Sequence, residues 1–188
     1  MEEAKKASSA MIAAYKPYVD KGIKIVGLEP SCLHTLRDEF LAMNPGSDAE
    51  KLADSALMLE EFLVQEQEKG SLEIDFSPMN RKALIHGHCH QKAFGGMGAV
   101  QSALGLIPEL KVELIDSSCC GMAGSFGYEV NHYDVSMAMA ELDLLPAIRD
   151  TDYQTLIVAD GTSCRHQIKD GVGREAKHVA RILEMALG

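Results

Sequence analysis

The sequence predicts an α/β fold in which helices cover a parallel β-sheet, and three observations support this prediction. The chain has 188 residues, 46% of them hydrophobic, which is enough for one domain with a substantial core. Short apolar runs rich in β-branched residues recur along the sequence. Segments with helical spacing of apolar residues separate these runs, and such alternation is typical of parallel sheets.

Four apolar runs have the length and composition of β-strands, and each ends in small or turn-forming residues. The segment from Gly70 to Arg81 interrupts the alternation and is expected to form a loop or a small hairpin. The predicted strands cover residues 23–28, 83–86, 112–116 and 155–159.

Helical spacing marks four further segments. The first reaches Pro17, the second begins with the capping-box pattern of Ser47 to Glu50, and the last ends before Gly188, a natural helix stop. The predicted helices cover residues 2–19, 47–63, 134–148 and 174–187. Strands and helices in this order predict a Rossmann-like parallel sheet with helices on both faces.

Each predicted strand leads directly into cysteine. Cys32 follows the first strand, Cys89 the second, the adjacent pair Cys119 and Cys120 the third, and Cys164 the fourth. In an open parallel sheet the carboxyl ends of the strands lie along one edge, where binding sites form. We therefore expect cysteines that are far apart in the sequence to meet at the carboxyl ends of the strands.

Charge and targeting signals exclude several classes of protein. The formal net charge is −10, from 18 basic and 28 acidic residues, and no basic cluster suits nucleic acid or an anionic membrane surface. No apolar run reaches the ~18 residues of a membrane span, and the N-terminal residues lack the form of a secretion signal. We expect a cytoplasmic protein that is peripheral to the inner membrane if its partners attach it there.

Five cysteines in a reducing compartment indicate core residues, catalytic thiols or metal ligands rather than a disulfide framework. A free cysteine taken alone is commonly a small buried hydrophobe, but five that all follow strands are hard to assign to packing. Four thiolates suffice for a [4Fe–4S] or [2Fe–2S] cluster. Gly121, Gly124 and Gly127 would let the backbone approach such a group closely.

Histidines surround Cys89. If His86, His88 and His90 continue the strand, they lie on one face and could bind zinc together with a nearby thiolate. The alternative is that His88 and His90 serve as outer partners of the metal ligands.

Four motifs together resemble a known family. They are Glu29-Pro-Ser-Cys32, His88-Cys-His-Gln-Lys92, Asp116-Ser-Ser-Cys-Cys-Gly-Met-Ala-Gly124 and Gly161-Thr-Ser-Cys-Arg-His-Gln167. The chain resembles the cysteine-rich CCG domain family, which occurs in heterodisulfide reductases and in the iron–sulfur subunits of glycolate oxidases. It looks closest to the C-terminal iron–sulfur region of FAD-linked oxidase fusion proteins.

The resemblance implies two tandem repeats packed as one globular unit. Residues 1–68 would be the end of a truncated first repeat, and residues 69–188 the second. The resemblance also implies that Cys89, Cys119, Cys120 and Cys164 are cluster ligands, joined by Cys32. The family pattern often closes with Cys-x-x-Cys, whereas this chain has Gln167 at the last position, so a five-thiolate noncubane cluster would need Cys32 there.

By this resemblance the chain is an oxidoreductase component. It would pass electrons from flavin-dependent oxidation of a glycolate- or lactate-like 2-hydroxy acid to a further acceptor through a [4Fe–4S] cluster. FAD would lie on a partner flavoprotein domain or subunit, and no catalytic residue is assigned in this chain. Further expected partners are the missing part of the first repeat and a second copy of the chain.

The residues leave three other functions open. The chain could be a structural Cys/His zinc module. It could be a thiol–disulfide domain that uses Cys119 and Cys120, although it has no Cys-x-x-Cys motif. It could also serve mainly to dock another chain.

Overall fold

The computed structural model describes all residues from Met1 to Gly188, and they form two compact units, Met1–Phe62 and Leu63–Gly188. Strands and helices alternate in both units, and every strand pair is parallel. The predicted α/β class is therefore confirmed.

The first unit is built on a two-stranded sheet. Strands β1 (Ile25–Gly27) and β2 (Ala56–Met58) pair in parallel, with Ile25 opposite Ala56. Its helices are α1 (Glu2–Val19), α2 (Pro30–Arg37), α3 (Glu39–Met43), α4 (Ser47–Ser55) and the start of α5 (Leu59–Glu68). Buried residues of these helices, including Phe40 and Leu52, form the core of this unit together with β2.

The second unit contains a four-stranded parallel sheet in the order β4-β3-β5-β6. The order places the first two strands of the unit side by side and adds the next two beyond β3. The strands are β3 (Lys82–Ile85), β4 (Lys111–Leu114), β5 (Leu156–Val158) and β6 (Ala176–Lys177).

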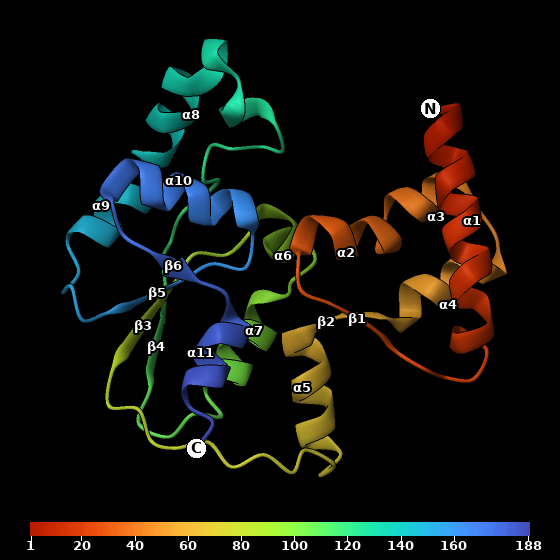
Figure 1. Cartoon of the computed structure of the whole chain (residues 1–188), viewed down its shortest axis with the longest axis horizontal. Coiled ribbons are helices and arrows are strands. Elements are labelled where there is room, and N and C mark those ends of the chain that lie inside the picture. Colours follow the sequence, from red (N-terminus) through yellow and green to blue (C-terminus); the bar gives the residue numbers. More distant parts are fainter. The chain divides into compact units, whose positions relative to one another are not determined.

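Helices cover both faces of this sheet (Figure 1). Alternate residues of the strands point to opposite faces, so Leu84 and Ile157 pack with one set of helices, while Ile85 and Val158 pack with the other. The first set is α8 (Tyr133–Ala140), α9 (Leu144–Arg149) and α10 (Thr162–Val172). The second is α7 (Met97–Leu104) and α11 (Val179–Met185).

Three local predictions were wrong. Residues 47–63 do not form one helix, because Ala56, Leu57 and Met58 are buried and pair with β1 as strand β2. The helix expected over residues 134–148 is divided into α8 and α9. The segment expected as a helix over residues 174–187 begins with strand β6, which pairs with β5 before α11 starts.

The remaining elements are short. Helix α6 (Cys89–Ala93) follows β3, and the 3-10 helices η1 (Phe126–Tyr128) and η2 (Val130–His132) follow the Cys119–Cys120 segment. Residues 70–81 are irregular apart from one bridge between Phe76 and Leu187, which fits the predicted loop. No helix is long and apolar enough to cross a membrane.

Candidate metal centre

Three neighbouring strands of the second unit deliver four of the five cysteines to one place. Cys89 begins α6 just after β3, Cys119 and Cys120 lie in the loop after β4, and Cys164 lies in the first turn of α10 after β5. Strands β4, β3 and β5 are adjacent and parallel, so their carboxyl ends share one edge of the sheet.

The four thiols form a continuous chain of contacts. Cys119 interacts with both Cys89 and Cys120, and Cys120 interacts in turn with Cys164. All four are free of disulfides. Cys89 is exposed and Cys119 half-buried, whereas Cys120 and Cys164 are only 4% and 2% exposed. The site therefore runs from the surface into the core.

Cys32, the fifth predicted ligand, lies in the first turn of α2, in the first unit, and its side chain is exposed. It follows β1 in the same way that Cys164 follows β5. Four of the five predicted ligands thus lie in the second unit, and the fifth lies in the first.

The contacts among the four thiols divide them into two kinds, those whose pKa is lowered and those whose pKa is raised. Cys120 and Cys89 act as hydrogen-bond donors to Cys119 and lower its pKa well below the usual value, helped by the backbone N–H groups of Gly121 and Ala123. Cys120 also lowers the pKa of Cys164 to about 5, with His86 acting in the same direction and burial opposing. The pKa values of Cys89 and Cys120 are raised, chiefly by their contacts with Cys119.

The contacts thus favour ionisation at Cys119 and Cys164 and protonation at Cys89 and Cys120. Thiolates are the form that binds soft metals and iron–sulfur clusters. The donor set fits such a group, because four sulfur atoms from three separate loops converge and two of them already favour ionisation.

Glycines permit the close packing of the cysteine loops. Gly121 has φ +92°, its N–H donates to Cys119 Sγ at 3.2 Å, and an added Cβ would lie 2.1 Å from the carbonyl oxygen of Ser136 in α8. At Gly161 an added Cβ would lie 2.4 Å from Cδ2 of His88 and 3.1 Å from Sγ of Cys164. A side chain at either position would push the thiol-bearing segments apart.

The three histidines near Cys89 do not share one face, because β3 ends at Ile85 and its alternation ends with it. His88 is the N-cap of α6, where its Nδ1 accepts from His90 N–H at 3.2 Å and lies 3.9 Å from Cys89 Sγ. His90 lies within α6, with its ring edge-on to that of His88. His86 instead faces the thiols, and one of its ring nitrogens lies within 4.8 Å of Sγ of both Cys120 and Cys164.

Lys92 contributes a positive charge that the sequence alone did not single out. Its Nζ donates to the carbonyl oxygens of Ser117 and of Ser118, the latter at 2.8 Å, and so holds the segment just before Cys119. Burial lowers the pKa of Lys92, and the thiolates of Cys164 and Cys119 act against that lowering. The signal in the sequence was its position one helical turn after Cys89.

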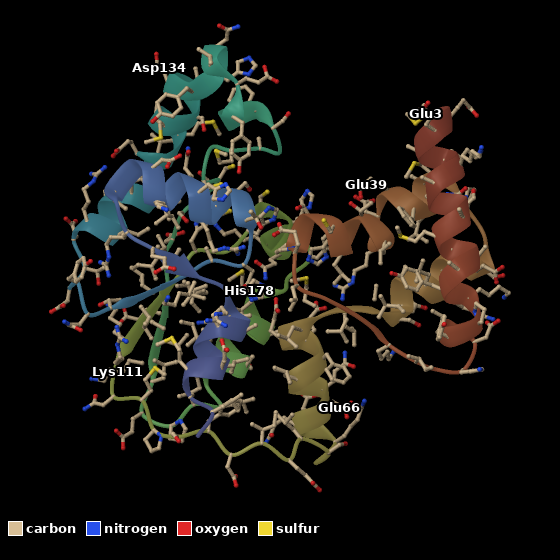
Figure 2. All side chains as sticks on the ribbon, in the orientation of Figure 1. Glu3, Glu39, Glu66, Lys111, Asp134 and His178 are labelled. Carbon is tan, nitrogen blue, oxygen red and sulfur yellow. The ribbon has the colours of Figure 1, made fainter.

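A buried polar network joins the strand ends behind the thiols. Gln91 accepts a hydrogen bond from His88 N–H at 3.2 Å and donates to Asp160 Oδ2 at 2.8 Å. Asp160 also accepts from Val179 N–H at 2.9 Å, so it caps α11 rather than the turn that follows its own strand. His178 is labelled in Figure 2 at the start of α11, and its Nε2 lies 3.5 Å from Asp160 Oδ1, the oxygen that accepts from Val179 N–H.

Gln167, which stands where the family pattern often has a closing cysteine, is only 2% exposed. Its Nε2 donates to both the carbonyl oxygen and Oγ of Ser136, at 3.0 and 2.9 Å. The side chain therefore ties α10 to α8.

Comparisons with known proteins point to dehydrogenases. The chain is 27% identical over 169 residues to a subunit of the anaerobic glycerol-3-phosphate dehydrogenase of Escherichia coli K12, covering 89% of the chain and 41% of that subunit. It is 27% identical over 164 residues to D-2-hydroxyglutarate dehydrogenase of the same organism, covering 86% of the chain and 15% of the enzyme. The D-2-hydroxyglutarate dehydrogenase of Pseudomonas putida is 24% identical over 185 residues, 95% of the chain and 17% of the enzyme.

The chain thus spans less than half the length of these curated relatives. No family model and no solved structure matches it. Because the relatives are dehydrogenases or part of a dehydrogenase, the comparisons confirm the expected relationship to a component of an oxidoreductase.

Proposed function

We propose that this chain is an iron–sulfur electron-transfer module of a larger flavin-linked dehydrogenase. The observation that carries the proposal is the continuous contact of four thiols from three parallel strand ends. In the proposal Cys89, Cys119, Cys120 and Cys164 hold a [4Fe–4S] cluster, which would supply one-electron chemistry when bound. His88 and His90 act as its outer partners. Cys32 belongs to the first unit, so its role as a ligand stays a prediction from the sequence.

The surroundings of the thiols suit electron transfer. Cys120 and Cys164 are buried, so water is largely excluded at the inner end, while the exposed Cys89 gives a short path to the surface. Gly121 N–H and the Lys92 ammonium place positive charge beside the sulfurs, which favours the more negative, reduced state of the site. The residues of this chain thus bind the group, shield it and set its potential.

The wider assignment rests on the resemblance and on the relatives. We infer that the chain belongs to the CCG domain family, with residues 69–188 as one repeat and residues 1–68 as the end of another. D-2-hydroxyglutarate is a 2-hydroxy acid, which supports a substrate of the glycolate or lactate type. The proposed partners are an FAD-bearing domain or subunit and the remainder of the first repeat, with the whole held in the cytoplasm or at the inner membrane.

The test is anaerobic purification followed by reconstitution with iron and sulfide. Near four iron and four sulfide per chain are expected, with an EPR signal on reduction, and both should be lost in Cys120→Ser. His166→Gln is the matched control, because His166 is exposed on α10 and hydrogen-bonded to Tyr128 Oη. Iron-free protein after reconstitution would contradict the proposal.

A structural zinc site is the second candidate function. It is favoured by the cluster of His86, Cys120 and Cys164, whose ligand atoms lie within 4.8 Å of one another, close enough for one tetrahedral ion after small adjustments. One zinc per chain, with no uptake of iron and sulfide, would establish this candidate in place of the first.

A further inference from the structure

The side chain of His86 is held in one orientation beside the thiols. It follows β3 directly, its backbone N–H donates to the carbonyl oxygen of Val158 at 2.8 Å, and it is 1% exposed. Ring atom Nδ1 lies 2.9 Å from Ser117 Oγ. The other nitrogen, Nε2, is buried and has no oxygen or nitrogen partner, and the ring contacts Cys164. A buried ring nitrogen beside a thiol calls for a function.

The neighbours of the ring indicate that function. One ring nitrogen lies within 4.8 Å of Sγ of Cys120 and of Cys164, the two most deeply buried thiols. Since Nδ1 is directed to Ser117, Nε2 is the nitrogen available to these sulfurs. An imidazole and two thiolates around one point are a recurring donor set for thiophilic metals.

We propose that His86 is a direct nitrogen ligand of the metal centre, so that the site has one imidazole in addition to its four thiolates. This inference rests on the proposed function for the identity of the centre. Iron in clusters accepts imidazole as well as thiolate ligands. Coordination requires the tautomer with hydrogen on Nδ1, and Ser117 Oγ, as acceptor of that hydrogen, would fix this tautomer.

A ligand role of His86 also accounts for the presence of Gln167 where the family pattern often has a closing cysteine. The resemblance implies a fifth ligand there, but Gln167 is an amide whose Nε2 is bound to Ser136. Cys32 belongs to the first unit, whereas His86 belongs to the same unit as the four thiols and already lies beside two of them. The fifth ligand is then supplied after β3 instead of on α10.

Two readouts test this ligand role independently of enzyme activity. The first is pulsed EPR of the reconstituted, reduced protein with 15N-labelled histidine, where a directly coordinated nitrogen gives a strong hyperfine coupling. The coupling is expected in the wild type and in His166→Gln, and it is expected to vanish in His86→Gln.

The second readout is the affinity of the metal-free protein for Co2+ alone, measured from thiolate-to-cobalt absorption. Removal of the orienting hydroxyl in Ser117→Ala should weaken binding by roughly 10- to 100-fold, the usual effect of an outer partner. His86→Gln should weaken it further, and His166→Gln should leave it unchanged. Ser117→Ala keeps all ligands and the buried ring, so it tests the role even if His86→Gln folds poorly.

The outcomes separate this inference from the proposed function. Iron uptake with no nitrogen coupling, and with Co2+ affinity unchanged in Ser117→Ala, would overturn the ligand role while leaving the iron–sulfur module intact. The ligand role would also be overturned if His86→Gln changed the reduction potential of the cluster while the wild type showed no nitrogen coupling. His86 would then be a hydrogen-bond donor to sulfur. Absence of iron uptake together with Co2+ binding that depends on His86 would support the ligand and refute the iron–sulfur function.

Discussion

The two units share a local motif, a strand followed by a cysteine near the start of a helix, but they differ in the number of cysteines that they contain. In both, a short buried or half-buried strand leads within a few residues to a cysteine near the start of a helix, Cys32 after β1 and Cys164 after β5. The first unit has two strands and one cysteine, whereas the second has four strands and four cysteines. The number of cysteines that meet within one unit therefore depends on how many parallel strand ends lie side by side.

The sharpest test of this comparison is a pair of cysteine variants. Cys164→Ala should abolish cluster uptake, because it removes a buried thiolate of the four-thiol chain. Cys32→Ala should retain the iron and sulfide content of the wild type, because His86 completes the ligand set within the second unit. Iron and sulfide analysis after anaerobic reconstitution measures both. Equal loss in the two variants would show that the first unit supplies an essential ligand.

A second pair of variants compares backbone constraints. Gly121→Ala should lower the free energy of unfolding by roughly 2–6 kcal/mol, since about 1–3 kcal/mol of backbone strain adds to about 1–3 kcal/mol of overpacking against Ser136. Gly22→Ala, also at positive φ but in open space, should cost only about 1–2 kcal/mol. Urea unfolding of the metal-free chain gives both values, and equal costs would show that the Cys119–Cys120 loop can move away from α8.

The third comparison concerns ion pairs. Arg37 binds Glu61 and the carbonyl oxygen of Ala56, and Glu61 accepts from Met58 N–H at 2.8 Å, so the pair fastens β2 to α2 and α5. Both side chains are mostly buried, at 16% and 17% exposed. Arg37→Met should therefore destabilise the first unit by roughly 2 kcal/mol. The exposed Arg149–Glu141 pair of the second unit should contribute less than about 1 kcal/mol, measured with Arg149→Met.

The same pair predicts a pH dependence. Burial raises the pKa of Glu61, but the hydrogen bonds from Arg37 and Met58 N–H prevail, so its folded-state pKa lies below the usual value of 4.5. A lowered folded pKa means that the pair stabilises the fold above about pH 4.5, and that this contribution is lost as the pH falls through the folded value. The difference between wild type and Arg37→Met should shrink in acid, and a difference that persists at about pH 2 would contradict the assignment.

The smallest expected effect is that of Lys92. In Lys92→Met the positive charge beside the thiolates is lost, so at acid pH, where Cys119 becomes protonated, its alkylation by iodoacetamide in the metal-free protein should slow by roughly 2- to 5-fold. Lys169→Met, at an exposed position of α10, is the control and should leave the rate unchanged. Mass spectrometry of the alkylated peptides gives the rate at each cysteine. A faster reaction in Lys92→Met would show that its chief role is to order the loop.

Much of this arrangement could be predicted from the sequence, because strands are marked by local composition. Leu84-Ile85 and Ile157-Val158 are apolar on both faces of the sheet, and the cysteines follow them in the sequence. β2 was missed because Ala56 also fits the helical spacing of Leu52 and Leu59, and only its pairing with β1 makes the segment a strand.

The direction of side chains beyond the strand ends could not be predicted. His86 and His88 are two residues apart and would share a face in a strand, yet one faces the thiols and the other caps α6. That difference arises because the backbone leaves the strand at Ile85. The contacts of Lys92 with Ser117 and Ser118 likewise join helix α6 to a loop that is distant in the sequence.

The two outer strands of the second unit carry a further consequence for how copies of this protein can meet. β6 has only two residues, and β4 exposes Lys111 and Glu113, the latter paired with Lys82 across the sheet. Short edge strands with charged side chains discourage the edge-to-edge pairing that leads to fibrils and aggregates. Pairing of copies through these two strands is therefore disfavoured, and a metal-depleted but folded sample should stay dispersed at concentrations where unfolded chains precipitate.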